Sequence, residues 1–476
     1  MSTAPQTVEP ALLVAGRLVH DVDYGDVINP ATGEPFARYP IATAALAEEA
    51  LSAARAALPA WAADAPRRQE VLRQIAAVLH ERSEELAATL SGEIGIPLRD
   101  ARLEVKMASA MLMHRAEAEL PVDVVHDDER QSVRVVRDPV GVVAAIIPWN
   151  APLLIACEKM GSAFAAGDTC VIKPSSMAPL TLVRLGTLVR DIVPEGVLSV
   201  LSGGNELGAV LTSHPDVAMV SFTGSVATGK RIMEAAVPTL KRLSLELGGN
   251  DAAIVMPGAD IARLAPKIFQ GAFYRSGQIC AAVKRVYVHE RDEQRLLDAF
   301  GALADAAVLG DPFDEHVTMG PLSNRPQLQE VSGMVQDALD TGGRAVSGGA
   351  ALDRPGFFYP PTVVTAVDAD TKIVKDEQFG PALPVVPYET LDGAVAAANG
   401  TEFGLGSSVW GDDVQAAAEV AAQMQAGSAW VNRHGLVMPE VPFGGFKYSG
   451  IGRSNGAVGI DAYCELKTIS VAKPRG

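Results

Sequence analysis

Short apolar runs separated by helical stretches constrain the fold of this chain more than any other feature. From residue 142 onward the runs lie at 142–147, 170–172, 198–201, 217–222 and 252–255. Each run has the length of a strand buried on both faces, and the stretches between them can hold a helix. This alternation predicts a parallel sheet with helices on its faces, an architecture that commonly binds nucleotides.

A second series of the same kind begins after Cys280. Its expected strands lie at 285–289, 383–388, 405–410 and 429–432, and loops rich in proline and glycine interrupt the chain between them. A chain of 476 residues is too long for one ordinary hydrophobic core. The sequence therefore predicts an α/β protein with two lobes, of which the first is the natural place for a nucleotide.

The segments before the first series are expected to be helical, followed by a ribbon. Leu72, Ile75, Leu79 and Leu86 recur at helical spacing in a stretch that ends near residues 95–97. Between residues 120 and 138, apolar and polar side chains alternate at 132–137. That alternation predicts a β-ribbon that forms an arm.

Charge and apolar segments argue against several functions. The formal net charge of −17 leaves no basic surface that could follow a nucleic acid backbone. Residues 1–16 lack the positively charged start of a signal peptide, so a cytoplasmic location is expected. The uncharged stretch 139–157 is interrupted by Pro148 and Pro152, which predicts a strand, a loop and a helix start rather than a membrane span.

The cysteines point to a reducing environment. The chain has Cys157, Cys170, Cys280 and Cys464, with no CxxC pair and no histidine at metal-ligand spacing. Neither disulfides nor a structural metal are therefore expected. Three of the four are interpreted as small core residues.

A glycine-serine turn stands where a dinucleotide fingerprint would be sought. No GxGxxG motif follows a strand, but Gly224 and Ser225 follow the run at 217–222 and precede a helical stretch. Glycine permits a tight turn, and the serine hydroxyl joins the free amides of a helix start, where a pyrophosphate is stabilised. Simple capping of the helix by Ser225 is the alternative.

Three residues have side chains suited to acyl chemistry. Cys280, in a loop that contains glycine, is a candidate nucleophile, and Glu246 is a candidate general base if an apolar setting raises its pKa. Asn150 follows the first apolar strand and could present its amide to a developing oxyanion. The alternatives are a buried apolar cysteine, a structural strand-end carboxylate and a turn between two prolines.

Taken together, these segments resemble the aldehyde dehydrogenase superfamily over nearly the whole chain. The ordered motifs are Pro148-Trp149-Asn150, Lys173-Pro174, Phe222-Thr223-Gly224-Ser225, Glu246-Leu247-Gly248-Gly249, Gly277-Gln278-Ile279-Cys280, Glu377-Gln378-Phe379-Gly380-Pro381, Pro442-Phe443-Gly444-Gly445 and Ser449-Gly450. The resemblance assigns Cys280, Glu246 and Asn150 the roles of nucleophile, general base and oxyanion donor. The loop at 432–436 and the residues 439–442 resemble a bacterial-type group whose substrate is broad or unassigned.

The resemblance also implies an organisation and a cofactor. A variant Rossmann lobe would comprise residues 1–119 and 140–248, a catalytic lobe 249–448, and an oligomerisation arm with a C-terminal segment 120–139 and 449–476. The expected partners are a small-molecule aldehyde and a second copy or three further copies of the chain. Residues expected to line NAD or NADP are Trp149, Lys173, Ser176, Gly204, Gly224, Ser225 and Leu247, with Glu377 and Phe379 at the nicotinamide half.

The implied reaction passes through a thioester. The Cys280 thiolate attacks the aldehyde, Asn150 and the Cys280 backbone N–H hold the oxyanion, and a hydride leaves for the nicotinamide. Glu246 then activates the water that releases the acid. A relative that transfers the acyl group to coenzyme A and a member that binds without catalysis are the alternatives. Glu246 argues against the first, and the presence of Cys280, Glu246 and Asn150 together argues against the second.

Three positions depart from the usual pattern of the resemblance. Ser176 stands where NAD-preferring members carry a glutamate, which predicts that NADP is accepted. Glu158 stands where an apolar side chain usually lines the substrate tunnel, which suggests amino- or hydroxyaldehydes; a solvated or lysine-paired glutamate is the alternative. His434 is expected near the tunnel mouth, either in contact with the substrate or simply exposed.

Overall fold

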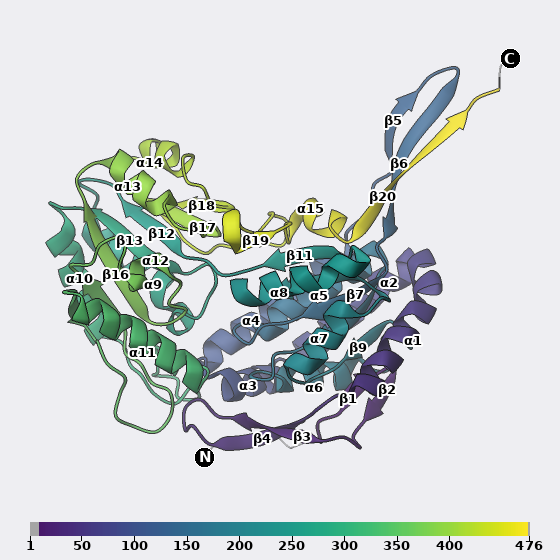
Figure 1. The fold of residues 1–476 in the computed structure, drawn as a ribbon, viewed down its shortest axis with the longest axis horizontal. Helices are drawn as coiled ribbons and strands as arrows, with labels where there is room; N and C mark the ends of the chain where they lie inside the picture. Colours follow the sequence, from purple (N-terminus) through teal and green to yellow (C-terminus); the bar gives the residue numbers. More distant parts are fainter. Residues whose placement is uncertain (1–8, 475–476) are drawn as a thin grey trace.

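Two α/β lobes and a protruding ribbon make up the molecule. The structure, a computed structural model, describes residues 9–474. Residues 1–8, the first half of the segment in which no leader is expected, lie outside the described residues, as do residues 475–476. The ribbon carries the C-terminal strand away from both lobes (Figure 1).

The first lobe is built on an eight-stranded sheet. In spatial order its strands are β19 (Gly450–Ile451), β11 (Arg242–Glu246), β10 (Val217–Thr223), β7 (Val142–Ile146), β8 (Thr169–Lys173), β9 (Leu198–Val200), β1 (Leu12–Val14) and β2 (Arg17–Val19). The five strands from β11 to β9 are parallel, and the outer ones are antiparallel. Strand order reverses between β7 and β10, which creates a crevice at the carboxyl ends of these two strands.

Helices cover both faces of this sheet. They are α1 (Ala44–Ala63), α2 (Ala65–Glu81), α3 (Ser83–Ile94), α4 (Leu98–Ala116), α5 (Pro152–Ala166), α6 (Leu180–Val189), α7 (Asn205–Ser213), α8 (Val226–Ala236) and α15 (Gly456–Asp461). Alternate residues of β7 enter different cores: Val143 and Ala145 pack with α2 to α6, whereas Val142 and Ala144 pack with α1, α7 and α8. Alternation between two apolar faces explains why the strand reads as one continuous apolar run.

The second lobe contains a seven-stranded, mostly parallel sheet. Its strands are β14 (Arg344–Ser347), β15 (Thr362–Thr365), β16 (Ala382–Tyr388), β13 (Val283–His289), β12 (Asp251–Val255), β17 (Gly406–Trp410) and β18 (Ser428–Val431). Its helices are α9 (Ile261–Phe273), α10 (Glu293–Asp305), α11 (Arg325–Asp340), α12 (Lys372–Lys375), α13 (Leu391–Asn399) and α14 (Val414–Ala421). Short 3₁₀ turns are η1 (Val237–Thr239), η2 (Tyr274–Gly277) and η3 (Lys447–Ser449).

The predicted ribbon is present, and it gains a third strand from the end of the chain. Strand β6 (Gln131–Pro139) lies between β5 (Asp123–Asp127) and β20 (Cys464–Ala472), and both pairs are antiparallel. The apolar side chains Val122, Val124, Val125, Leu466 and Val471 are exposed here. A three-stranded sheet with exposed apolar side chains on a single chain is a candidate interface.

Most expected elements are present, and three expectations need correction. The chain does not open with helices: β1, β2 and the hairpin β3 (Tyr24–Ile28)–β4 (Pro35–Pro40) come first. The run at 252–255 belongs to the second sheet rather than the first series, and β11 was not expected as a strand. Residues 450–451, grouped with the arm, pair with β11 instead. Strands of two to five residues are too short to show a clear period, and a run does not reveal its sheet.

Other expectations are confirmed. Leu72, Ile75, Leu79 and Leu86 are fully buried, and α3 ends at Gly95 in a left-handed conformation. Cys157, Cys170 and Cys464 are buried core residues without disulfides. The stretch 139–157 forms a strand, a loop and a helix start, and no helix within residues 9–474 is long and apolar enough to cross a membrane.

Candidate active site

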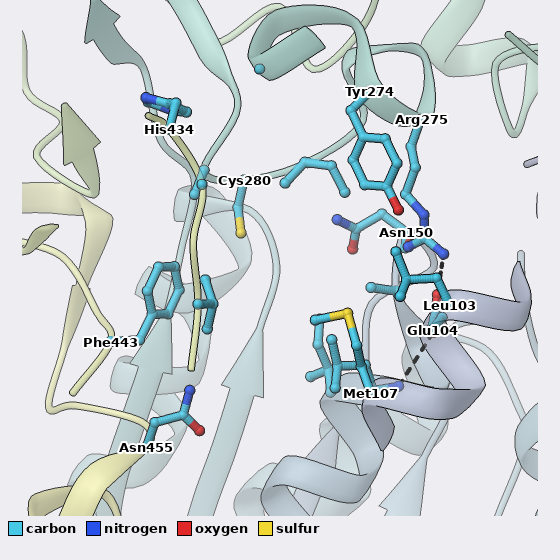
Figure 2. A pocket seen from close by; sticks show the side chains of 18 of the residues that line it. Leu103, Glu104, Met107, Asn150, Tyr274, Arg275, Cys280, His434, Phe443 and Asn455 are labelled. Atoms are coloured by element: carbon cyan, nitrogen blue, oxygen red, sulfur yellow. Dashed lines mark hydrogen bonds and ion pairs between the residues drawn. The ribbon is translucent and has the colours of Figure 1, made fainter. Parts of the chain in front are cut away.

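A cavity of about 770 Å³ lies where the two lobes meet. Asn150, Glu158, Glu246, Cys280 and His434 all line it, although they come from widely separated parts of the sequence. Its other walls are mainly apolar and include Met107, Met111, Leu154, Ile155, Tyr274 and Phe443. Figure 2 shows the Cys280 sulfur directed into this space, with Asn150 on the opposite side. The cavity therefore brings together the three expected catalytic side chains.

The topology of the first sheet explains this meeting. Asn150 follows β7 and Glu246 is the last residue of β11, so both lie at the carboxyl edge of the parallel strands. Ligands of open α/β sheets bind at this edge. Cys280 comes from the other lobe, in the loop between η2 and β13.

Two glycines permit the close approach between the lobes. A Cβ atom on Gly249 would overlap the backbone oxygen of Cys280, and one on Gly248 would overlap the carboxylate of Glu377. Both glycines lie in the short connection from β11 to β12, where the chain passes from one sheet to the other. Their missing side chains let the cysteine loop and Glu377 pack directly against that connection.

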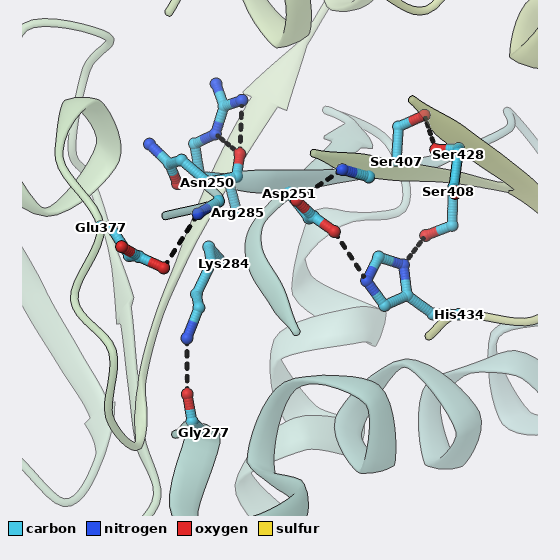
Figure 3. A network of polar contacts seen from close by, with 12 residues as sticks. Asn250, Asp251, Gly277, Lys284, Arg285, Glu377, Ser407, Ser408, Ser428 and His434 are labelled. Carbon is cyan, nitrogen blue, oxygen red and sulfur yellow. Dashed lines mark hydrogen bonds and ion pairs between the residues drawn. The ribbon is translucent and has the colours of Figure 1, made fainter. Parts of the chain in front are cut away.

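The cysteine loop has an unusual backbone conformation. Arg275, Ser276 and Gly277 have φ values of 51°, 57° and 70°, all in the left-handed region. Ser276 Oγ donates to the Gly320 oxygen at 2.8 Å, and Lys284 Nζ donates to the Gly277 oxygen at 2.5 Å (Figure 3). Two successive non-glycine residues in this region are strained, and the surrounding hydrogen bonds hold them there.

Asn150 is fixed by the same loop. Its side-chain Nδ2 donates to the Gln278 backbone oxygen at 3.0 Å, and its own backbone oxygen accepts from Arg275 Nη1 at 3.0 Å. An amide nitrogen carries two protons, so one further N–H is available to a ligand. This is the arrangement that an oxyanion donor requires.

Burial dominates the electrostatics of the thiol and of its neighbouring carboxylate. Burial raises the pKa of Glu246 to about 8, although Lys159 and a hydrogen bond with the Cys280 thiol lower it. Burial also raises the pKa of Cys280 well above its usual value, and the nearby Glu246, Glu377 and Asp251 raise it further. This environment therefore favours the neutral Cys280 thiol over the thiolate of the expected mechanism.

The residues expected to bind the cofactor lie along the carboxyl edge of the first sheet. Lys173 is the last residue of β8, and Ser176 is exposed just beyond it. The other residues follow strands: Trp149 comes after β7, Gly204 after β9, Gly224 and Ser225 after β10, and Leu247 after β11. None of these residues lines the cavity of Cys280. They form a second surface beside the cavity. The two adjoin because Trp149 and Leu247 are next in sequence to Asn150 and Glu246, which line the cavity.

Several features of this edge fit a dinucleotide. A Cβ atom on Gly204 would meet nothing within 4 Å, so the surface is open there. Burial lowers the pKa of Lys173 to about 8, and its Nζ donates to the Pro174 oxygen at 3.2 Å, which leaves further protons to offer. Ser225 caps α8 by accepting the Thr228 N–H at 3.3 Å. The capping alternative is thus realised, and a phosphate role for this turn stays a prediction.

Glu377 and Phe379 approach the same edge from the second lobe. Glu377 accepts the Gly249 N–H at 3.0 Å. The Phe379 ring meets the Trp149 ring edge-on, with centroids 5.4 Å apart. These contacts place both side chains beside the Cys280 loop, at the end of the cofactor edge that is expected to hold the nicotinamide.

The two expected substrate residues are both buried. Glu158 Oε2 lies 3.9 Å from Lys159 Nζ, so the alternative of a lysine-paired glutamate is realised. Its Oε1 has no hydrogen-bond partner within residues 9–474. His434 lines the cavity, but Nδ1 lies 2.9 Å from Ser408 Oγ and Nε2 lies 3.5 Å from Asp251 (Figure 3). The alternative of a simply exposed histidine is wrong, because 1% of its side chain is exposed. A substrate contact by His434 stays a prediction.

Sequence reasoning missed the buried charges around the site. Glu104, Lys159, Arg275 and Lys284 are all buried beside the predicted residues. One signal was available: Glu104 shares helical spacing with the buried Ala101, Val105 and Ala108 on α4, so it falls on an apolar face. A charged residue on such a face is almost always paired.

Comparisons with known proteins agree with this geometry. The model of the aldehyde dehydrogenase family matches residues 20–469. A betaine aldehyde dehydrogenase from Cereibacter sphaeroides is 37% identical over 449 residues, covering 94% of this chain and 93% of the relative. The NAD+ complex of an aldehyde dehydrogenase from Bacillus cereus has a TM-score of 0.95 at 32% identity, covering 98% of this chain and 96% of that chain. PnpE from a Pseudomonas species gives 0.95 at 37% identity, with 98% and 99% covered.

Fold and matches together define an α/β oxidoreductase with two lobes. The chain belongs to the aldehyde dehydrogenase family, and its reaction is the oxidation of an aldehyde.

The conformation of Gly277 yields a prediction. A Cβ atom there would be strained at φ 70° and would overlap the Gly380 oxygen, whereas Gly33, at φ 77°, has only ordinary contacts. We expect Gly277→Ala to lower the free energy of unfolding by about 3 kcal/mol and Gly33→Ala by about 1 kcal/mol. Only Gly277→Ala should slow aldehyde oxidation, by roughly tenfold or more, because it displaces Cys280. Denaturant unfolding and steady-state rates measure both effects; equal losses in the two variants would contradict the argument.

Proposed function

We propose that this enzyme oxidises its aldehyde through a thioester on Cys280, with a nicotinamide dinucleotide as the electron acceptor. The observation that carries the proposal is the cavity that Cys280, Asn150 and Glu246 line together. Such an arrangement supplies a nucleophile, an oxyanion donor and a base to one bound carbonyl.

The first half of the reaction forms the thioester. Glu246 accepts the thiol proton, and the Cys280 sulfur attacks the carbonyl carbon of the aldehyde. The remaining N–H of Asn150 and the backbone N–H of Cys280 stabilise the oxyanion; one such donor contributes about 3 kcal/mol to lowering the barrier. The bound nicotinamide supplies the acceptor for the hydride that the carbonyl carbon loses, which leaves an acyl thioester.

The second half releases the carboxylic acid. Once Glu246 has released the thiol proton to solvent, its carboxylate takes a proton from a water that attacks the thioester carbonyl carbon. The carbon–sulfur bond then breaks, and the leaving Cys280 sulfur takes that proton back from Glu246. The burial of Glu246 supports this role, because its pKa near 8 makes it a better base than an ordinary carboxylate. We therefore favour water over coenzyme A as the acyl acceptor.

The cofactor is proposed to be NAD, with NADP also accepted. Relatives solved with NAD+ support the first part. Support for the second part is that Ser176 is exposed beside Lys173, so no carboxylate at that position repels a 2′-phosphate. In this assignment residues 1–119 and 140–248 bind the cofactor, and residues 249–448 carry the nucleophile.

We further propose that the ribbon joins copies of the chain into a dimer or tetramer. The exposed apolar side chains of β5 and β20 support an interface there. Static light scattering of the purified protein measures the assembly, and a monomer at micromolar concentration would contradict the proposal.

The substrate is proposed to carry a cationic or hydroxyl group beyond its aldehyde. Glu158 supports this proposal, because its Oε1 lies buried beside an otherwise mostly apolar cavity and has no hydrogen-bond partner in the part of the chain that the structure describes. A buried acceptor without a donor is costly, and a hydroxyl group or an ammonium N–H on a ligand would satisfy it. A quaternary ammonium group has no N–H and would act on Glu158 through its charge alone. The relative from Cereibacter sphaeroides is named for betaine aldehyde, which carries a quaternary ammonium group.

The main test is turnover of an aldehyde panel. Aliphatic, aromatic, hydroxylated and amino-aldehydes are mixed with the protein and either NAD or NADP, with and without coenzyme A. We expect reduced-nicotinamide absorbance with both cofactors and without coenzyme A, and none with Cys280→Ala. Turnover by Cys280→Ala would contradict the thioester, a strict need for coenzyme A would contradict hydrolysis, and no rate with NADP would contradict the interpretation of Ser176.

The raised pKa of Glu246 predicts a pH dependence for thioester hydrolysis. Only the carboxylate form accepts a proton from water, so the rate should be low at pH 6 and rise to a plateau above pH 9, with its midpoint near pH 8. A single-turnover measurement on enzyme acylated beforehand isolates this step. Glu246→Gln should remove the pH dependence and slow hydrolysis about 100-fold or more. A flat wild-type profile from pH 6 to pH 10 would rule out this role.

Glu158 is tested with a matched pair of substrates. Trimethylammonium butanal and its uncharged tert-butyl counterpart have nearly the same shape and differ in charge. Glu158→Gln should lower the ratio of kcat/KM for the charged over the neutral aldehyde about tenfold, equivalent to about 1.4 kcal/mol. Glu81→Gln, an exposed change on α2, is the control. An unchanged ratio in Glu158→Gln would exclude a charge-selective role.

A further inference from the structure

A buried ion pair lies in the wall of the cavity beside Asn150. The carboxylate of Glu104, on α4, contacts Nη2 of Arg275, which belongs to the cysteine loop. The two side chains are 2% and 5% exposed (Figure 2). Neither residue has a part in the mechanism described above, and a buried pair of this kind is rarely the most stable solution for a protein interior.

Glu104 caps the first turn of α5, the helix that follows Asn150. Its Oε1 accepts the backbone N–H groups of Leu153 and Leu154 at 3.0 and 3.2 Å. The helix α5 has no capping hydrogen bond from its own N-cap residue, Ala151. A carboxylate from α4 therefore takes over the cap and also faces the positive end of the helix dipole.

Arg275 connects this helix start to the nucleophile. Its Nη1 donates to the backbone oxygen of Asn150, and the Asn150 amide in turn donates to the Gln278 oxygen, two residues before Cys280. Main chain and side chain of Asn150 are thus both held by the loop that carries the thiol. The guanidinium is suited to this task because it can serve Glu104 and Asn150 at once in a fixed plane.

Arg275 stays positively charged although it is buried. Burial alone would lower the pKa of Arg275, but its attraction to Glu104 raises the pKa above the ordinary value. Its Nε has no hydrogen-bond partner among the described residues. The pair therefore leaves a buried donor without a partner, which is consistent with a role in geometry rather than in stability.

We propose that Glu104 and Arg275 are positioning residues that fix the Asn150 amide relative to the Cys280 thiol. The inference rests on the proposed thioester reaction. The pair acts on steps that build an oxyanion at Cys280 and leaves the intrinsic reactivity of the thiol unchanged.

The test measures oxyanion stabilisation at Cys280 separately from the intrinsic reactivity of its thiol. Acylation by p-nitrophenyl acetate forms an oxyanion and needs no cofactor, whereas alkylation by iodoacetamide displaces iodide at a saturated carbon and forms none. In Glu104→Gln/Arg275→Met the glutamine oxygen can still cap α5, and neither member of the ion pair is left charged without the other. We expect acylation to fall on the order of 10- to 100-fold in this variant and alkylation to change less than about twofold.

A double-mutant comparison identifies the route of the effect. In the Asn150→Ala background, the same two changes should lower the acylation rate less than about threefold, because the group that they position is gone. Equal losses in both backgrounds, or a parallel loss of alkylation, would overturn the inference. If that variant fails to fold, Arg275→Lys tests the same point, since one ammonium cannot hold Glu104 and Asn150 in the same plane.

Two controls complete the experiment. Arg68 is buried to the same degree as Arg275 and donates to the backbone oxygens of Trp61 and Ala62, away from the cavity. Arg68→Met should leave the acylation rate within about twofold. A wild type that is acylated by the ester but oxidises no aldehyde would contradict the proposed function alone. A wild type that oxidises aldehydes, with an equally active Glu104→Gln/Arg275→Met, would contradict this inference alone.

Discussion

The site depends on the contact between the connection that joins the two sheets and the loop that carries the nucleophile. Gly248 and Gly249 have no side chains, so the chain can pass from β11 to β12 directly beneath Cys280 and Glu377. That contact brings the last residue of β11, Glu246, into the cavity of a cysteine from the other lobe. A larger residue at Gly249 would press against the Cys280 backbone, and one at Gly248 would press against the Glu377 carboxylate.

Much of the fold follows from the sequence, because buried parallel strands leave continuous apolar runs. Val142 and Val143 face different cores, yet both are apolar, so the run is visible without knowledge of its neighbours. What the pattern does not contain is the partner of each strand. Residues 252–255 are an ordinary apolar run, and only three-dimensional pairing with β13 and β17 assigns them to the second sheet.

The sequence predicted the reacting residues of the site but not the charged residues that hold them in place. Cys280, Glu246 and Asn150 are identified through the resemblance, since each alone has a plain structural alternative. The charges that hold them were not identified, because a single glutamate on a helix or arginine in a loop is normally solvated. Glu104 falls on an apolar face of α4, but its partner Arg275 becomes recognisable only when α4 and the cysteine loop meet, 171 positions apart in the chain.

Several buried charges of this molecule lie where the lobes join. Removing an ion from water is unfavourable unless partners replace its hydration, and here many of those partners belong to the other lobe. Arg275 of the second lobe contacts Glu104 of the first, and its Nη1 also binds the Asn150 backbone oxygen of the first lobe. Each such contact is satisfied only at one relative position of the two lobes. The charges therefore add little to stability, but they define the geometry in which the thiol, the amide and the carboxylate face one cavity.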